Sequence, residues 1–153
     1  MENKRSIRIK YKSKFELKEF QINSIAQIEN GNSVIVTAPT GSGKTIIAYA
    51  AMMKALREGK TFVYTAPLKA INEQKLQEFK VEIVEQLLKN KQDWSFLRQL
   101  DDNAARIEAE KFAKEKVGLI TGDRTINIDA PIKIMTTEVY NLMRRSDTYA
   151  ERN

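Results

Sequence analysis

The feature that most constrains this chain is the octapeptide at residues 38–45, Ala-Pro-Thr-Gly-Ser-Gly-Lys-Thr. It follows a short β-branched run at 33–37, typical of a strand buried on both faces, and it precedes a helix-favouring segment at 45–57. A glycine-rich turn between a strand and a helix is the setting of a phosphate-binding loop. Gly41 and Gly43 let successive backbone N–H groups turn inward, and the following helix adds its positive N-terminal end. The sequence therefore predicts a nucleoside-triphosphate site.

The residues of this loop have distinct expected roles. Lys44 supplies a mobile cation for the β- and γ-phosphates, and the Thr45 hydroxyl can ligate the Mg²⁺ that bridges them. We therefore expect Lys44 and Thr45 to be the catalytic residues and Thr45 to be the metal ligand. The expected nucleotide-binding residues are Ala38, Pro39, Thr40, Gly41, Ser42, Gly43, Lys44 and Thr45. Ala38 stands where the general pattern has glycine, and the alternative interpretation is a glycine-rich turn with an incidental lysine.

Composition narrows the chemistry further. The 153 residues include no Cys and no His, which excludes disulfides, metals ligated by Cys or His, thiol nucleophiles and imidazole acid–base catalysis. Lys and Arg number 26 against 20 Asp and Glu, and the net charge of +6 permits a nucleic-acid partner without requiring one. No apolar run approaches the roughly 20 residues of a membrane span, and the charged N-terminus differs from a signal peptide. We expect a soluble, intracellular protein without membrane contact, in the cytoplasm first, with an organelle or the nucleus as open alternatives.

Strand-like and helix-like segments alternate along the chain. Further strand patterns lie at 61–65, 117–121 and 132–136, and helical patterns lie at 20–28, 69–79 and 138–145. This alternation predicts an α/β fold with a parallel sheet and right-handed crossovers. Residues 7–12 alternate apolar and basic side chains, which predicts a strand whose lysines protect an exposed edge or form an RNA-touching arm. Residues 80–116 are strongly charged and predict one or two surface helices, a solvated insertion without a function of its own.

Three strings around the loop carry a family resemblance. They are FELKEFQINSIAQIENG at 15–31, TAPLKAINEQKLQEF at 65–79 and VGLITGDRTINIDAPIKIMTTEVYNLM at 117–143. Their order resembles that of the superfamily 2 helicases, and most closely the DExH-box RNA helicases of the superkiller and exosome-associated group. The resemblance implies that residues 1–153 are the N-terminal portion of a RecA-like ATP-binding domain, a parallel-sheet α/β fold that is incomplete here, with 80–116 as a helical insertion.

The same resemblance implies ATP and Mg²⁺ as cofactors, with Gln21 reading the adenine and Phe15 stacking near the base. It also implies a track for single-stranded RNA, bound without regard to sequence. The expected RNA-contacting residues are Pro67, Leu68, Lys69, Gly122, Asp123, Thr137 and Glu138. They follow predicted strands, and loops at the carboxyl ends of parallel strands are where such sheets bind ligands. Taken singly, each loop could equally be an ordinary capped turn.

One expected part of an ATPase of this type is missing from the sequence. The chain has no Asp-Glu dipeptide and no His, and Arg124 follows Asp123 where a second carboxylate would be needed. Asp123 is therefore interpreted as a turn residue. We expect the ATP-binding segment of an ATP-dependent RNA helicase, without turnover by itself, and the rest of the motor in a full-length protein. A stand-alone nucleotide- or RNA-binding module and, less favoured, a small phosphotransferase remain alternatives.

Overall fold

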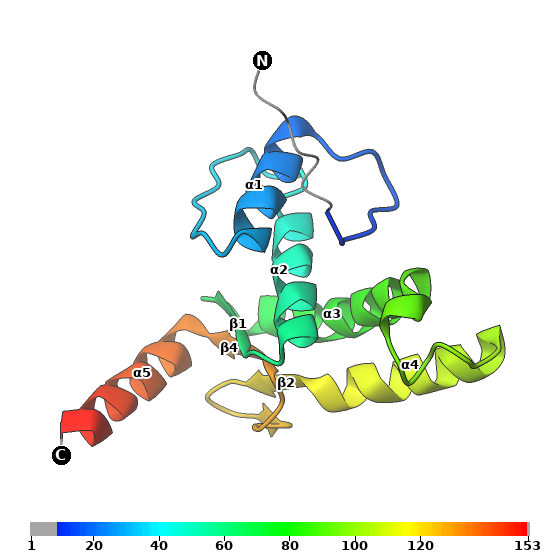
Figure 1. The fold of residues 1–153 in the computed structure, drawn as a ribbon. Helices are drawn as coiled ribbons and strands as arrows, with labels where there is room; N and C mark the ends of the chain where they lie inside the picture. Colours follow the sequence, from blue (N-terminus) through cyan, green and yellow to red (C-terminus); the bar gives the residue numbers. More distant parts are fainter. Residues whose placement is uncertain (1–8, 153) are drawn as a thin grey trace. The chain divides into compact units, whose positions relative to one another are not determined.

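The structure is a computed structural model that describes residues 9–152, with side chains described as far as residue 146. The chain forms two compact units, Met1–Glu58 and Gly59–Asn153 (Figure 1). The strand predicted over 7–12 lies partly outside the described residues, and its described part, 9–12, is not in a strand. Among the described residues, no helix is long and apolar enough to cross a membrane.

The first unit contains two helices, α1 (Glu19–Glu29) and α2 (Thr45–Glu58), as the sequence predicts. Their apolar positions are buried, and they include Ile25 on α1 and Ile47, Ala50, Met52 and Met53 on α2. Polar contacts join the ends of the two helices. The Lys54 ammonium donates to the Ile28 carbonyl over 2.9 Å, and the Arg57 guanidinium pairs with the Glu29 carboxylate at 2.8 Å. The two helices are thus held together by apolar packing and by these two cations.

The strand predicted over 33–37 is not present, and this prediction was wrong. The segment is in no helix or strand, and the side chain of Ile35 is 96% exposed. A β-branched run becomes a strand only where a neighbouring backbone satisfies its N–H and C=O groups. Within residues 9–152 no strand is paired with 33–37. The β-branched pattern shows that the segment favours an extended conformation. It does not show whether a neighbouring strand is present to pair with it.

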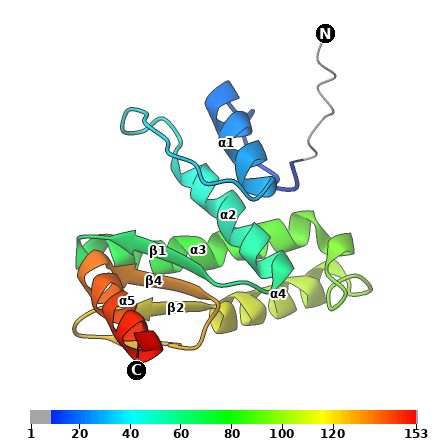
Figure 2. The same cartoon turned by 60° about the vertical axis from the view of Figure 1, so that its left-hand side comes forward.

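The second unit is built on a four-stranded sheet (Figure 2). Its elements are β1 (Phe62–Ala66), α3 (Lys69–Lys89), the 3₁₀ turn η1 (Lys91–Asp93), α4 (Asp102–Lys116), β2 (Val117–Ile120), β3 (Thr125–Ile126), β4 (Ile132–Thr136) and α5 (Thr137–Arg152). The strand order is β1-β4-β2-β3, with β4 parallel to both β1 and β2, and β3 antiparallel to β2. The α/β class and the three parallel strands are confirmed, whereas the two-residue β3 was not predicted.

One face of the sheet packs against α3. Phe62 and Tyr64 on β1 meet Phe79 of α3 edge to face, at ring-centroid distances of 6.2 and 5.2 Å. The neighbouring side chains Ile132 and Ile134 of β4 are fully buried. This alternation of inward side chains along β1 and β4 is what a sheet face covered by a helix requires. The face therefore supplies the main core of the second unit.

Within 80–116 the chain forms the end of α3, the turn η1 and α4, as the prediction of one or two helices implies, with a non-helical segment at 94–101, and part of the range is buried. The helix α3 continues unbroken to Lys89, and α4 lies alongside it (Figures 1 and 2). Ala105, Ala109 and Ala113 of α4 are buried, and their spacing of four residues places them on one stripe of the helix. Small side chains let two helix backbones approach closely. The high charge of the segment concealed this stripe, so α4 is more deeply packed than a fully solvated helix would be.

Candidate functional site

The loop at 38–45 does not follow a strand, contrary to the prediction, but its two glycines and the helix after it have the conformation expected of a phosphate-binding loop. Gly41 and Gly43 have φ values of 81° and 95°, in the left-handed region that favours glycine, and Thr45 begins α2 directly after them. The first turn of a helix carries N–H groups without intrahelical partners and the positive end of the dipole. The Lys44 ammonium lies across the loop and donates to the Ala38 carbonyl over 2.7 Å. The loop thus gathers a cation and helix N–H groups in one place.

Ser42 is in an unusual environment in this loop. Its hydroxyl is buried and, among the described residues, makes no hydrogen bond, although its backbone N–H donates to the Pro39 carbonyl over 3.2 Å. Buried hydroxyls in proteins nearly always have a partner, and an orphan one calls for an explanation. A phosphate oxygen in the loop would provide that partner. The Thr45 hydroxyl, at the first position of α2, is the oxygen ligand of the loop that a hard cation such as Mg²⁺ would take.

Gln21 is joined to this loop by its side-chain amide. Its Nε2 donates to the Gly43 carbonyl over 2.9 Å, and its Oε1 accepts the backbone N–H of Lys18 over 2.8 Å. The side chain is 4% exposed, and a Cβ on Gly43 would lie only 2.3 Å from Nε2, so only glycine allows this approach. An amide nitrogen has a second proton and an amide oxygen a second lone pair, so each end can still meet a base.

Lys18 is a functional candidate that the sequence reasoning missed. It is the N-cap of α1, and its ammonium donates to the Ser42 carbonyl over 3.3 Å. Nothing in the sequence marks it, because a capping box begins with Ser or Thr and a lysine ammonium cannot accept a hydrogen bond. Phe15, predicted to stack near the base, is 77% exposed, so its ring is accessible.

In the second unit, three predicted RNA-contacting loops lie at one edge of the sheet. The register pairs Ala66 with Thr136 and Ile120 with Met135, so β1, β4 and β2 end side by side. The loops that follow them hold the predicted residues Pro67, Leu68, Lys69, Gly122, Asp123, Thr137 and Glu138. The N-cap of α3 is Leu68, which makes no side-chain cap. The first N–H groups of α3 therefore have no side-chain acceptor from their cap residue.

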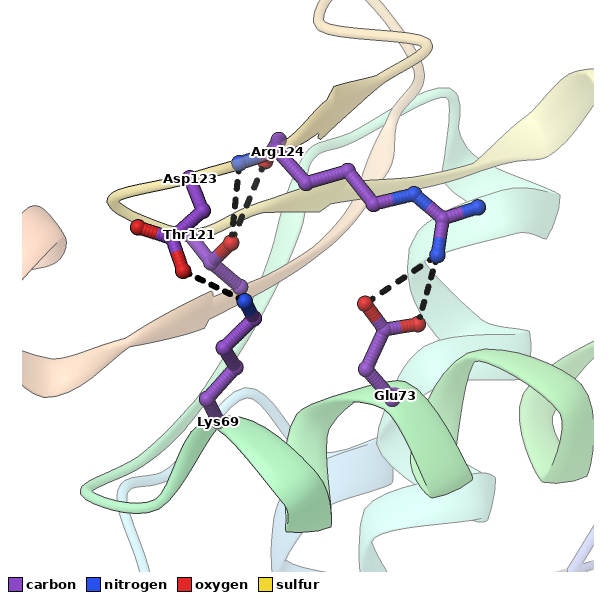
Figure 3. A network of polar contacts seen from close by, with 5 residues as sticks. All are labelled: Lys69, Glu73, Thr121, Asp123 and Arg124. Atoms are coloured by element: carbon purple, nitrogen blue, oxygen red, sulfur yellow. Dashed lines mark hydrogen bonds and ion pairs between the residues drawn. The ribbon is translucent and has the colours of Figure 1, made fainter.

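Two ion pairs connect α3 with the turn at 121–124 (Figure 3). The Lys69 ammonium lies 2.5 Å from Asp123 Oδ2, and the Arg124 guanidinium contacts both carboxylate oxygens of Glu73 at 3.0 and 3.1 Å. The Lys69 ammonium, through its hydrogen bond and its charge, lowers the pKa of the Asp123 carboxyl below its ordinary value. Sequence reasoning placed Lys69 and Asp123 in the site but missed Glu73 and Arg124.

Asn72 is a further residue that was missed. It is fully buried on the first turn of α3, and its Nδ2 donates to the Ala66 carbonyl over 3.2 Å. This bond ties the helix to the last residue of β1, immediately before the Pro67–Lys69 loop. On the next strand, the Thr136 hydroxyl accepts the N–H of Val139 over 3.3 Å and so caps α5.

The match to known proteins agrees with this architecture. Residues 18–140 match the model of the DEAD/DEAH box helicase family. The chloroplastic DExH-box ATP-dependent RNA helicase DExH15 of Arabidopsis thaliana is 38% identical over 129 residues, 84% of this chain and 8% of that protein. The antiviral helicase SKI2 of Saccharomyces cerevisiae is 36% identical over 129 residues, 84% of this chain and 8% of that protein. The ATP-dependent RNA helicase mtr4 of Schizosaccharomyces pombe is 36% identical over 129 residues, 84% of this chain and 9% of that protein.

The chain therefore spans only 8–9% of the length of these three relatives. Within that span the similarity runs through the loop at 38–45 and the three loops at the sheet edge, which confirms the resemblance drawn from the sequence. The chain belongs to the DEAD/DEAH box helicase family.

Proposed function

We propose that this chain is the ATP-binding segment of an ATP-dependent RNA helicase, holding ATP with Mg²⁺ at 38–45 and the backbone of single-stranded RNA at the sheet edge. The observation that carries the nucleotide site is the loop itself. Two left-handed glycines flank Ser42, whose buried hydroxyl has no hydrogen-bond partner among the described residues, and a helix begins at Thr45. Phosphate oxygens would accept hydrogen bonds from the Ser42 hydroxyl and from the first backbone N–H groups of α2.

ATP would use the groups of the first unit as follows. The Lys44 ammonium, now on the Ala38 carbonyl, would move to the β- and γ-phosphates, and the Thr45 hydroxyl would hold Mg²⁺. When bound, Mg²⁺ neutralises part of the negative charge of the phosphates. Gln21 would hydrogen-bond the edge of the adenine, and the exposed ring of Phe15 would stack near it. Lys18 holds the amide of Gln21 and so belongs to the same arrangement.

RNA would bind at the edge where β1, β4 and β2 end. The uncapped N–H groups at the start of α3 and the ammonium of Lys69 suit phosphate oxygens. The Asp123 carboxylate repels a phosphate, so its proposed partner on RNA is the ribose 2′-hydroxyl, a group that distinguishes RNA from DNA. Backbone groups and sugar hydroxyls occur in every sequence, and this supports binding without regard to base. Three relatives carry RNA helicase or antiviral helicase in their names.

The remaining expectations stand as parts of this proposal. We propose that the rest of the motor belongs to the full-length protein, that 1–153 is one ATP-binding segment and that 80–116 is an insertion within it. The proposed location is inside the cell, with the cytoplasm first. One observation favours a second candidate, a nucleotide- and RNA-binding module without turnover, because the chain has no Asp-Glu dipeptide.

Lys44→Ala tests the nucleotide site. Charge-assisted hydrogen bonds are worth about 1.5–3 kcal/mol, so we expect nucleotide binding to weaken about tenfold to a hundredfold. The fold should not change, because the Lys44 side chain is exposed. Titration of fluorescent ATP against both proteins measures the effect, and circular dichroism checks the fold.

Lys111→Ala is the matched control for this experiment. Lys111 is an exposed lysine on α4, so its substitution removes the same charge away from the loop. Affinity should stay within about twofold of the unmutated chain, as is usual for an exposed position. Equal affinities for Lys44→Ala and Lys111→Ala, with matching spectra, would rule out the phosphate loop.

A further inference from the structure

Glu73 and Arg124 form an ion pair beside the pair of Lys69 with Asp123. Glu73 lies four residues after Lys69, so the two side chains share one face of α3. Arg124 follows Asp123 in the turn at 121–124. The two ion pairs therefore run in parallel from the first turns of α3 to the same turn, as Figure 3 shows. One nitrogen of the Arg124 guanidinium, Nη1, donates to both carboxylate oxygens of Glu73, at 3.0 and 3.1 Å.

The turn at 121–124 is closed on itself. The Thr121 N–H donates to the Arg124 carbonyl over 2.9 Å, and the Arg124 N–H donates to the Thr121 hydroxyl over 3.2 Å. Because the backbone of Arg124 is fixed in this way, a contact made by its side chain positions the whole turn. Asp123, in the middle of the turn, is carried with it. The Glu73 contact thus determines where Asp123 stands relative to Lys69.

We propose that Glu73 and Arg124 are positioning residues for RNA binding, because their ion pair holds the turn at 121–124 against α3 and fixes the spacing between Lys69 and Asp123. The inference rests on the proposed binding of RNA at this edge. Lys69 has a long, flexible side chain, and a ligand gains affinity when such a group is held in place before binding. The charged contact of Nη1 with both oxygens of Glu73 provides that order, because it ties the turn to α3 beside Lys69.

The ion pair of Glu73 with Arg124 is too exposed to contribute much to the stability of the fold. The Arg124 side chain is 55% exposed and that of Glu73 33% exposed. Exposed ion pairs contribute little to the free energy of unfolding. We therefore expect the unfolding midpoint to stay nearly constant when the pair is broken, while the binding of RNA changes.

The variant Glu73→Gln distinguishes an effect of the ion pair on the position of the turn from an effect of the Glu73 charge on RNA. The substitution removes a negative charge near the proposed RNA track, so Coulomb attraction alone would make RNA bind more tightly. Loss of the ion pair releases the turn and makes RNA bind more weakly. We expect binding about two- to fivefold weaker, the range for one exposed ion pair. The sign of the change therefore decides between the two accounts.

The test measures fluorescence anisotropy of a labelled single-stranded oligouridine with the 153-residue chain. Glu108→Gln, an exposed position on α4, is the control that makes the same change of charge away from the pair, and it should bind unchanged or slightly more tightly. The exchanged variant Glu73→Arg with Arg124→Glu rebuilds the pair in reverse and should recover affinity lost in Glu73→Gln. Unchanged or tighter binding by Glu73→Gln, in a chain that binds the oligouridine, would overturn the proposal.

A second readout does not depend on RNA. The ¹³C shift of the Asp123 carboxyl against pH reports whether Asp123 stays beside Lys69, because the Lys69 ammonium lowers the pKa of that carboxyl. We expect the pKa of Asp123 to move towards its ordinary value in Glu73→Gln and to stay low in Glu108→Gln. If the unmutated chain fails to bind oligouridine, the proposed RNA function fails and this readout alone judges the pair. An unchanged titration of Asp123 in Glu73→Gln would then overturn the positioning role.

Discussion

At the scale of single residues, the amide of Gln21 has a fixed orientation. Its oxygen accepts the N–H of Lys18 and its nitrogen donates to the carbonyl of Gly43, so neither end can exchange with the other. Adenine and guanine present different donors and acceptors on the same edge. An amide that cannot turn over therefore suits one of these bases and not the other.

Gln21→Ala should reduce the preference for ATP over GTP. A hydrogen bond of this kind is worth about 0.5–1.5 kcal/mol, so the ratio of the two affinities should fall about two- to tenfold. Parallel titrations with fluorescent ATP and GTP measure the ratio. Gln77→Ala, an exposed glutamine on α3, is the control that should keep it. An unmutated chain that binds both nucleotides equally would remove Gln21 from base recognition.

The carboxyl of Asp123 should titrate below its ordinary pKa of 3.8, because the Lys69 ammonium stabilises the charged form. The pKa is lowered in the folded state, so what the pair adds to stability is present above 3.8 and is lost as the pH falls through the lower folded pKa. Lys69→Met should return the titration to the ordinary value, whereas Lys111→Met should leave it low. The ¹³C shift of the carboxyl against pH measures both.

That measurement also tests whether the pair exists in solution. An Asp123 that titrates at its ordinary pKa in the unmutated chain would show that the ion pair with Lys69 is not formed there. The titration reports the pair of Lys69 with Asp123 directly, and the pair of Glu73 with Arg124 only through the position of the turn.

At the scale of elements, β2 depends on a glycine. A Cβ on Gly118 would lie 2.3 Å from the carbonyl oxygen of Asn127 and 2.8 Å from that of Ile126, both backbone atoms. Asn127 cannot move aside freely, because its Nδ2 donates to the carbonyls of Lys114 and Val117 over 2.9 and 3.2 Å. The close approach of the β3 segment to β2 therefore needs glycine at 118.

Gly118→Ala should lower the free energy of unfolding by about 1–3 kcal/mol, the usual cost of forcing an extra methyl group into a packed site. Gly122→Ala is the control, because a Cβ there has nothing within 4 Å, and its effect should stay within about 0.5 kcal/mol. Urea denaturation measures both. Equal midpoints for the two variants would show that β3 does not lie against Gly118.

The sequence predicted elements well where one local pattern determines them. Runs of apolar residues predicted β1, β2 and β4, because a strand buried in a parallel sheet is apolar along its length. The same pattern failed at 33–37, where pairing depends on a neighbour that the pattern does not describe. The strand β3 has two residues and is too short to show any period. The buried stripe on α4 was readable in its alanine spacing but hidden among charged residues.

For the candidate site, too, the sequence predicted local features but not contacts between distant residues. The loop at 38–45 was predicted as a candidate site because the spacing of residues close together on the chain carries the chemistry. The partners across space were not, because Arg124 lies 51 residues from Glu73 and Asp123 lies 54 from Lys69. A single sequence gives no sign of which distant charges meet. Lys18 and Asn72 were missed because their roles are to hold other groups rather than to touch a ligand.

At the scale of the whole molecule, the proposed ATP site would supply only part of the chemistry of an ATPase. Hydrolysis needs Mg²⁺, an oriented water and a cation for the charge that develops on the transferred phosphate. In the proposed site, Thr45 would hold the Mg²⁺ and Lys44 would supply the cation. The chain has neither a His nor an Asp-Glu dipeptide to orient the water.

We therefore expect the 153-residue chain to bind ATP, to bind RNA weakly and to turn over almost no ATP. An arginine finger alone is worth about 10³–10⁵ in rate, so a chain without one and without the water-orienting carboxylate should stay near background. The remaining RNA binding should be electrostatic and should fall as salt rises, consistent with a net charge of +6. A phosphate-release assay on the purified chain, with and without single-stranded RNA, measures turnover beside the Lys44→Ala control. Turnover that RNA stimulates and Lys44→Ala abolishes would mean that a carboxylate of this chain completes the site.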